Sequence, residues 1–211
     1  FFGNPNLQPT IFDNFEVKLS ALNYAFIGYN FTQAKNQVVQ IVKREGDVIL
    51  QTSDNLDRMK THNFNIGFPV PLAIFNTPFK DIMKMDMNPD QVSFIFLYGS
   101  YQLQQIDQII NPKGYWTYNV TGQFILPYKT KFTANYTYLT KGNEFFFYPN
   151  KSFYNTLNLS LSRKFNQERM TVTLFANDVF NTNETNLRTT NALPNVNIRN
   201  KNDTRTFGLS F

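Results

Sequence analysis

The chain has 211 residues, no Cys, a formal net charge of +5 and 17% aromatic residues, among them 23 Phe and 11 Tyr. The lack of Cys excludes a disulfide framework and thiolate chemistry. No apolar run is long enough for a membrane-spanning helix, and basic residues occur in pairs such as Lys43-Arg44 rather than in the clusters typical of nucleic-acid-binding proteins. A mean hydropathy of −0.37 still permits a membrane protein built from strands, because strands with one apolar and one polar face average to a polar sequence.

Apolar residues recur at every second position in much of the chain, which is the period of a β-strand with two different faces. The pattern is clearest from Trp116 to Leu126, where Thr117, Asn119 and Thr121 occupy the alternate positions. The sequence predicts about nine strands and no amphipathic helix of useful length. In chain order the expected strands lie near 14–21, 27–32, 64–70, 92–103, 115–126, 131–139, 156–162, 170–177 and 207–211.

The connections between these strands alternate in length. Tight connections are expected at about 22–23, 127–129 and 166–168, and long ones at about 35–61, 104–114, 140–153 and 178–204. Only the third connection, about 72–91, breaks the alternation. The last connection, at about 178–204, is polar and rich in Asn, and we expect it to be mobile. In an up-and-down antiparallel sheet, odd and even connections lie at opposite ends, and short turns at one end with long loops at the other are typical of bacterial outer-membrane barrels.

These patterns predict an all-β, transmembrane antiparallel barrel in the bacterial outer membrane, with short periplasmic turns and long extracellular loops. The apolar face would contact lipid, and the polar face would line a water-filled or plugged lumen. Trp116 and Tyr138 would lie in the aromatic girdles at the membrane interfaces. Since such barrels have even strand numbers and the first strand starts at the long-loop end, we expect residues 1–211 to form the C-terminal portion of one larger barrel domain.

Three segments resemble a known family. Gly3–Pro9 (GNPNLQP), followed by Asn14-Phe15-Glu16, resembles a segment that enters a late strand of TonB-dependent outer-membrane receptors, although Thr10 stands where the family usually has Glu. Asn177–Thr182 (NDVFNT) resembles the element after their penultimate strand, and Thr204–Phe211 resembles their final strand. By pattern and composition, the chain is most similar to the Bacteroidetes-type, TonB-dependent-receptor-like outer-membrane β-barrel proteins.

The resemblance implies a barrel of about 22 strands closed by an N-terminal plug. Such a barrel imports a scarce nutrient, which could be a siderophore, a glycan, a peptide or a metal complex. The partner implied by the resemblance is the TonB complex, reached through a plug outside these residues. Outer-membrane lipid and lipopolysaccharide are expected around the barrel, and a surface lipoprotein could contact the loops. Phe207, Leu209 and Phe211 would form the closing strand that directs assembly.

A run of four aromatic residues, Phe145, Phe146, Phe147 and Tyr148, falls in a predicted extracellular loop. An exposed aromatic cluster often marks a binding surface, so these residues are the candidate ligand contacts. The alternative is that these residues pack between loops or extend the strands above the membrane.

Four basic residues follow in the last long connection. They could contact anionic lipopolysaccharide or simply be solvated. These residues are Arg188, Arg199, Lys201 and Arg205.

The sequence offers no catalytic set and no phosphate loop, so we expect neither enzymatic activity nor a cofactor. His62 is the single His, and no Cys accompanies it, which argues against a usual metal site. Met83, Met85 and Met87 could bind Cu(I) through their thioethers, or could belong to a turn or a strand start.

Two other functional classes remain open. One is an outer-membrane barrel that serves as an adhesion or secretion scaffold without active transport. The other is a soluble β-sandwich binding module, in which Trp116, Phe124 and Leu157 would be buried in protein.

Overall fold

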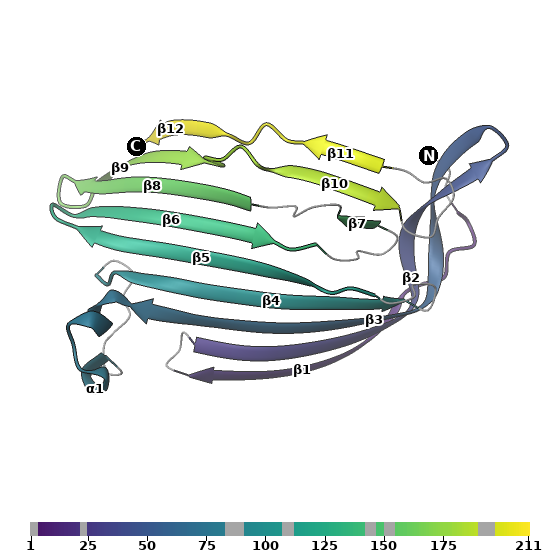
Figure 1. Cartoon of the computed structure of the whole chain (residues 1–211), viewed down its shortest axis with the longest axis horizontal. Helices are drawn as coiled ribbons and strands as arrows, with labels where there is room; N and C mark the ends of the chain where they lie inside the picture. The colour runs from purple at the N-terminus through teal and green to yellow at the C-terminus, as the bar shows by residue number, and fades with distance from the viewer. Residues whose placement is uncertain are drawn as a thin grey trace.

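The computed structural model describes residues 4–21, 25–82, 91–106, 112–141, 147–149, 155–189 and 197–211. Nine antiparallel strands form one curved sheet in the order β1-β2-β3-β4-β5-β6-β8-β9-β12, which follows the chain (Figure 1). Their bounds are β1 Ile11–Ala21, β2 Ala25–Glu45, β3 Val48–Pro71, β4 Phe94–Ile106, β5 Tyr115–Leu126, β6 Thr130–Leu139, β8 Asn155–Phe165, β9 Met170–Asn177 and β12 Thr206–Ser210. The remaining described strands, β7 (Phe147–Pro149), β10 (Glu184–Thr189) and β11 (Asn197–Lys201), form a separate three-stranded sheet.

The prediction of nine strands in a meander is confirmed for this sheet. The short connections lie together at the left of Figure 1, and the long ones lie at the right. At the short-turn end, Thr130 N–H donates to the Pro127 carbonyl at 3.3 Å, and Arg169 N–H donates to the Asn166 carbonyl at 3.2 Å. The third connection, at this same end, contains the short helices η1 (Leu72–Phe75) and α1 (Phe79–Ile82).

The second connection differs from the expected loop at 35–61. Strands β2 and β3 continue far beyond their neighbours and pair to Glu45 and Val48, leaving only Gly46 and Asp47 in the turn. Gly46 has φ +60, a conformation that only Gly adopts freely at the first position of a two-residue hairpin turn. The β-branched residues of this segment favour strands, and they outweigh the irregular polar pattern that suggested a loop.

The last long connection is also more regular than expected. It contains β10 (Glu184–Thr189) and β11 (Asn197–Lys201), which form an antiparallel hairpin, and β10 also pairs with β7 (Phe147–Pro149) from the connection before it. The connection therefore contains paired strands where only a loop was expected, and its mobility stays a prediction. The composition suggested an irregular loop because the many Asn residues hide any alternation of apolar and polar positions. Strand pairing nevertheless satisfies the backbone hydrogen bonds of a polar segment as well as those of an apolar one.

The two faces of the large sheet differ sharply in chemistry. One cross-strand row on the polar face contains Ser20, Phe26, Gly67, Tyr98, Asn119, Thr137 and Thr156. The neighbouring row on the apolar face contains Leu19, Ile27, Ile66, Gly99, Tyr118 and Tyr138. No second layer of described residues covers the apolar face, where Val120 is 37% exposed and Leu174 is 54% exposed.

The apolar face has the height of a membrane. Rings of Tyr101, Trp116, Tyr118 and Tyr138 form a continuous stack near the long-loop end, with centroid distances of 5.2 to 6.4 Å. From Trp116 to Leu126 the strand covers about 33 Å, which at the tilt usual for outer-membrane barrels gives a band about 25 Å tall. A β-sandwich would bury Trp116, Phe124 and Leu157 in protein, but all three are only partly buried, which argues against that fold.

The main cluster of buried apolar residues lies at the base of the long hairpin. Ala34, Val39, Leu56, Met59 and Ile106 pack there, next to a distortion of β2 at Asn36. No helix in the described part of the chain is long and apolar enough to cross a membrane.

The segment before β1 is fastened to the same hairpin. Asn55 accepts a hydrogen bond from Gln8 N–H at 2.7 Å, and its amide donates to the carbonyls of Gln8 and Asn36 at 3.0 and 2.7 Å. The GNPNLQP motif that carries the family resemblance therefore includes a residue that docks onto β3.

Candidate functional site: the polar face and its two ends

The polar face carries a lattice of short polar side chains on β5 and β6. The Asn119 amide donates to Thr137 Oγ1 at 2.9 Å, and the Asn135 amide donates to Thr121 Oγ1 at 2.7 Å. Asn119 and Asn135 also bond to each other across the strands at 3.3 Å. The two Asn-x-Thr sequences that produce this lattice lie inside β5 and β6.

Aromatic rings lie flat on this face where the partner strand has Gly. A Cβ added to Gly67 would lie 2.6 Å from the Phe26 ring, and one added to Gly208 would lie 2.3 Å from the Phe175 ring. Phe26 and Gly67 are cross-strand partners, as are Phe175 and Gly208. These rings, together with Phe96 and Tyr98 of β4, add apolar surface to a face that carries many polar side chains.

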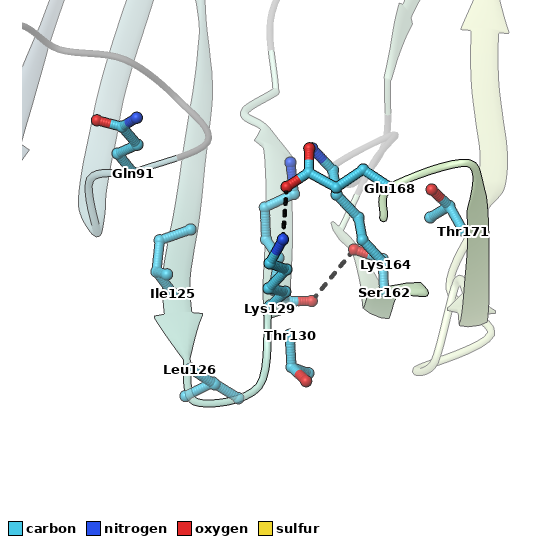
Figure 2. Close-up of a pocket in the computed structure, with 10 residues that line it drawn as sticks. Gln91, Ile125, Leu126, Lys129, Thr130, Ser162, Lys164, Glu168 and Thr171 are labelled. Atoms are coloured by element: carbon cyan, nitrogen blue, oxygen red, sulfur yellow. Dashed lines mark hydrogen bonds and ion pairs between the residues drawn. The ribbon is translucent and has the colours of Figure 1, made fainter. Parts of the chain in front are cut away.

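A basic hollow of about 490 Å³ opens at the short-turn end of the polar face (Figure 2). Lys129, Lys131 and Lys164 line it together with Glu168. The Lys129 ammonium lies 3.0 Å from one Glu168 carboxylate oxygen, and the Lys164 ammonium lies 3.6 Å from the other. The hydrogen bond from Lys129, with the charges of Lys129 and Lys164, lowers the pKa of Glu168. Three cations against one carboxylate leave the hollow positive.

At the opposite end, Asp178 is a buried carboxylate with 2% of its surface exposed. It lies just beyond β9 with φ +44, and its oxygens accept hydrogen bonds from Thr182 N–H at 3.0 Å, Asn183 N–H at 3.2 Å and Thr204 Oγ1 at 2.7 Å. Burial opposes ionisation, but these three donors outweigh it and hold the pKa of Asp178 below its usual value. Asp178 therefore anchors both ends of the connection that contains β10 and β11.

The predicted aromatic ligand cluster is only partly described. Phe145 and Phe146 lie outside the described residues. Phe147 and Tyr148 lie in β7 and pair through the backbone with Thr189 and Arg188 of β10. This backbone pairing joins the two loops, and both the ligand-contacting role and the packing of the aromatic side chains stay predictions.

The predicted closing strand is β12, the last strand of the sheet. Phe207 and Leu209 point to the apolar face and are 71% and 58% exposed, and Phe211 follows the strand with 92% exposure. Their role in assembly stays a prediction.

Of the four basic residues in the last connection, Arg199 binds Glu184 through two hydrogen bonds of 3.0 and 3.3 Å. Lys201 and Arg205 are exposed, and Arg188 lies in β10. Arg199 is therefore held within the β10–β11 hairpin, whereas the contacts proposed for the others stay predictions.

His62 is the only residue considered for metal binding that falls within the described ranges, and its neighbours there are aromatic. His62 Nδ1 lies 2.8 Å from the Tyr29 hydroxyl, and its ring lies 5.0 Å from that of Phe31. Within the described ranges no group of three potential ligands among His, Cys, Asp and Glu comes together. Met83, Met85 and Met87 lie outside the described residues.

Sequence reasoning missed Asp178 and the basic hollow. In the sequence Asp178 stands out only within the NDVFNT motif, although an Asp directly after a strand favours a turn, because its side chain bonds to nearby backbone N–H groups. The hollow joins two turns that are about 40 residues apart, so its members share no local pattern.

A single sheet with one uncovered apolar face, one hydrogen-bonded polar face and loops sorted by end is consistent with an outer-membrane β-barrel. Comparison with curated proteins and with solved structures gave no match. The outer membrane protein beta-barrel family matches residues 1–211. The chain therefore belongs to the outer membrane protein beta-barrel family and resides in the bacterial outer membrane.

Proposed function

We propose that this chain forms part of a TonB-dependent outer-membrane receptor, of the type found in Bacteroidetes, that takes up a scarce nutrient. The observation that carries the proposal is the polar face, whose side chains bond to one another and are not covered by a second layer of described residues. Such a face suits the wall of a water-filled or plugged lumen, because only wide barrels leave their interior polar and unfilled.

The direction of the strands supports a barrel larger than nine strands. With an odd number of antiparallel strands, β1 and β12 run in the same direction, so they could meet only as a parallel pair. Closure by antiparallel pairing needs an odd number of further strands, and both edges are left open until these are added. We infer that residues 1–211 supply one section of a barrel of about 22 strands with a plug, as in transporters of this kind.

Uptake measurements test the proposal. Cells that contain the protein, cells that lack it and cells depleted of TonB would be compared for uptake of siderophores, glycans, peptides and metal complexes under limitation for each. We expect one substrate class to be lost both without the protein and without TonB. Uptake of every class at the wild-type rate in cells lacking the protein would contradict the proposal, as would uptake that persists without TonB.

The loops offer a sharper version of this test. Replacing Glu184–Lys201 by a short Gly-Ser turn removes β10 and β11, and it should lower uptake if the loops bind the substrate. Gln167→Gly, a change in a tight turn at the opposite end, serves as the matched control and should leave uptake unchanged. Equal uptake by both variants would argue against recognition by this loop.

A scaffold without transport is the second candidate, and the long β2–β3 hairpin favours it. Residues 36–57 protrude past β1 and β4, and Val38 and Val48 are 37% and 57% exposed. A scaffold predicts that shortening this hairpin abolishes surface attachment or secretion, while no uptake depends on TonB. The same three strains therefore separate the two functions.

A further inference from the structure

Arg163 occupies an unusual place on the lipid-facing surface. It lies in β8 on the same face as Leu159 and Leu161, and it pairs with Thr130 of β6 near the short-turn end. Among the described residues, its guanidinium has no carboxylate partner and donates no hydrogen bond. A cation with five unused N–H donors on a lipid-facing surface requires an acceptor from outside the sheet.

Two aromatic rings hold this cation. The guanidinium carbon lies 5.6 Å from the centre of the Tyr128 ring and 5.0 Å from the centre of the Phe165 ring. Tyr128 belongs to the turn between β5 and β6 and is 80% exposed. Aromatic residues at the ends of barrel strands lie at the level of lipid headgroups, so the rings fix Arg163 at that depth.

A shallow apolar hollow of about 490 Å³ lies on the same face, next to Arg163 along β8. It exists because Ala176 is short and lies between its cross-strand partners Leu159 and Phe207. Leu161, which also lines the hollow, is two residues from Arg163, about 7 Å along the strand. The hollow and the cation are therefore placed end to end.

We propose that this surface binds one glycerophospholipid of the leaflet at the short-turn end. The headgroup phosphate accepts a bidentate pair of hydrogen bonds from Arg163, and one acyl chain lies in the hollow beside Ala176. Charge complementarity selects the phosphate, since guanidinium matches its geometry with two parallel N–H donors. The proposal rests on the outer-membrane location and is independent of any transport activity.

Native mass spectrometry tests the proposal on the protein at its native length, isolated from outer membranes in mild detergent. The expected result is that one phospholipid remains bound to the wild type and that Arg163→Gln loses it. Lys18→Gln is the matched control, because the Lys18 ammonium lies 5.0 Å from the Phe26 ring on the polar face. It removes an equal charge and a comparable ring contact, and it should retain the lipid.

Titration with defined lipids measures the size of the effect. Arg163→Gln should weaken binding of dioleoyl phosphatidylethanolamine about tenfold or more, as expected for loss of charge-assisted hydrogen bonds. Dioleoylglycerol, which has the same chains but no phosphate, should bind the wild type as weakly as the phospholipid binds the variant. Equal binding of both lipids by the wild type, or unchanged binding by Arg163→Gln, would overturn the proposal.

The hollow is tested separately. Ala176→Phe should fill it and weaken phospholipid binding while Arg163 stays in place. The heat-dependent gel shift of folded barrels confirms that each variant is assembled. An assembled Ala176→Phe variant that binds phospholipid as the wild type does would overturn the acyl-chain assignment.

Discussion

Replacing Asp178 by Asn should detach the connection that contains β10 and β11 from the end of the sheet. The carboxylate accepts three hydrogen bonds while 2% exposed, whereas an amide has one acceptor oxygen and would point its NH₂ group at a donor. At least one of the three hydrogen bonds is lost, and the remaining ones go to a neutral amide oxygen instead of a charged carboxylate. Because bonds to a charged group contribute about 1.5 to 3 kcal/mol and neutral ones about 1 kcal/mol, we expect a local destabilisation of about 2 to 4 kcal/mol.

Trypsin cleavage at Arg199 and Lys201 reports on this detachment, since both lie in the connection that Asp178 anchors. Asp203→Asn is the matched control, because it removes an equal charge from an exposed residue of the same connection. Cleavage of Asp178→Asn should be at least tenfold faster than cleavage of the control. Equal cleavage of the two variants would refute the account of Asp178 as an anchor.

The pH dependence gives an independent check on the same residue. Since the pKa of Asp178 is lowered in the folded protein, its stabilising contribution is complete above the ordinary Asp pKa of about 4 and is lost as pH falls through the lower folded value. The wild type and Asp178→Asn should therefore differ most at neutral pH and converge in acid. If the stability difference between the wild type and Asp178→Asn stayed constant down to low pH, the ionised Asp178 carboxylate would not be the stabilising group.

Three other changes test the remaining contacts. Lys129→Gln should raise the pKa of Glu168 toward its usual value, because Lys129 supplies the main hydrogen bond and a close charge; an NMR titration of the carboxyl that shows no change would be contrary to this account. Gly208→Ala should weaken the β9–β12 pair by about 1 to 3 kcal/mol, because the new methyl group overlaps the Phe175 ring, and urea unfolding should recover when Phe175→Leu is added. Asn55→Ala should speed hydrogen exchange in the segment before β1, and unchanged exchange there would mean that Asn55 does not hold it.

The strands of the large sheet were predictable because each has two different faces. From Trp116 to Leu126 the alternation is nearly perfect, and it also fixes the register, since a slip by one residue would turn polar side chains toward lipid. The tight turns were equally visible, because Pro127 and Asn166 begin them with residues that favour turns.

The loops were less predictable for a physical reason. Pairing above the membrane needs no apolar face, so β10, β11 and the far part of the long hairpin show no consistent alternation in hydropathy. The same holds for the basic hollow and for the bond from Thr204 to Asp178, because these contacts join residues that are 26 to 39 positions apart in the chain. The alternation of apolar and polar residues reflects the contact of one strand face with lipid, so it is visible in the sequence. The hollow and the long-range bond to Asp178 depend on how distant segments pack in the fold.

The lattice of Asn119, Thr121, Asn135 and Thr137 has a consequence for any solute that reaches it. Each of these side chains already has a partner, so a passing solute exchanges one set of hydrogen bonds for another and gains little by stopping. Such a surface is readily hydrated and would bind polar solutes only weakly. In the proposed receptor, discrimination among solutes would therefore occur in the loops, before a solute reaches this polar face.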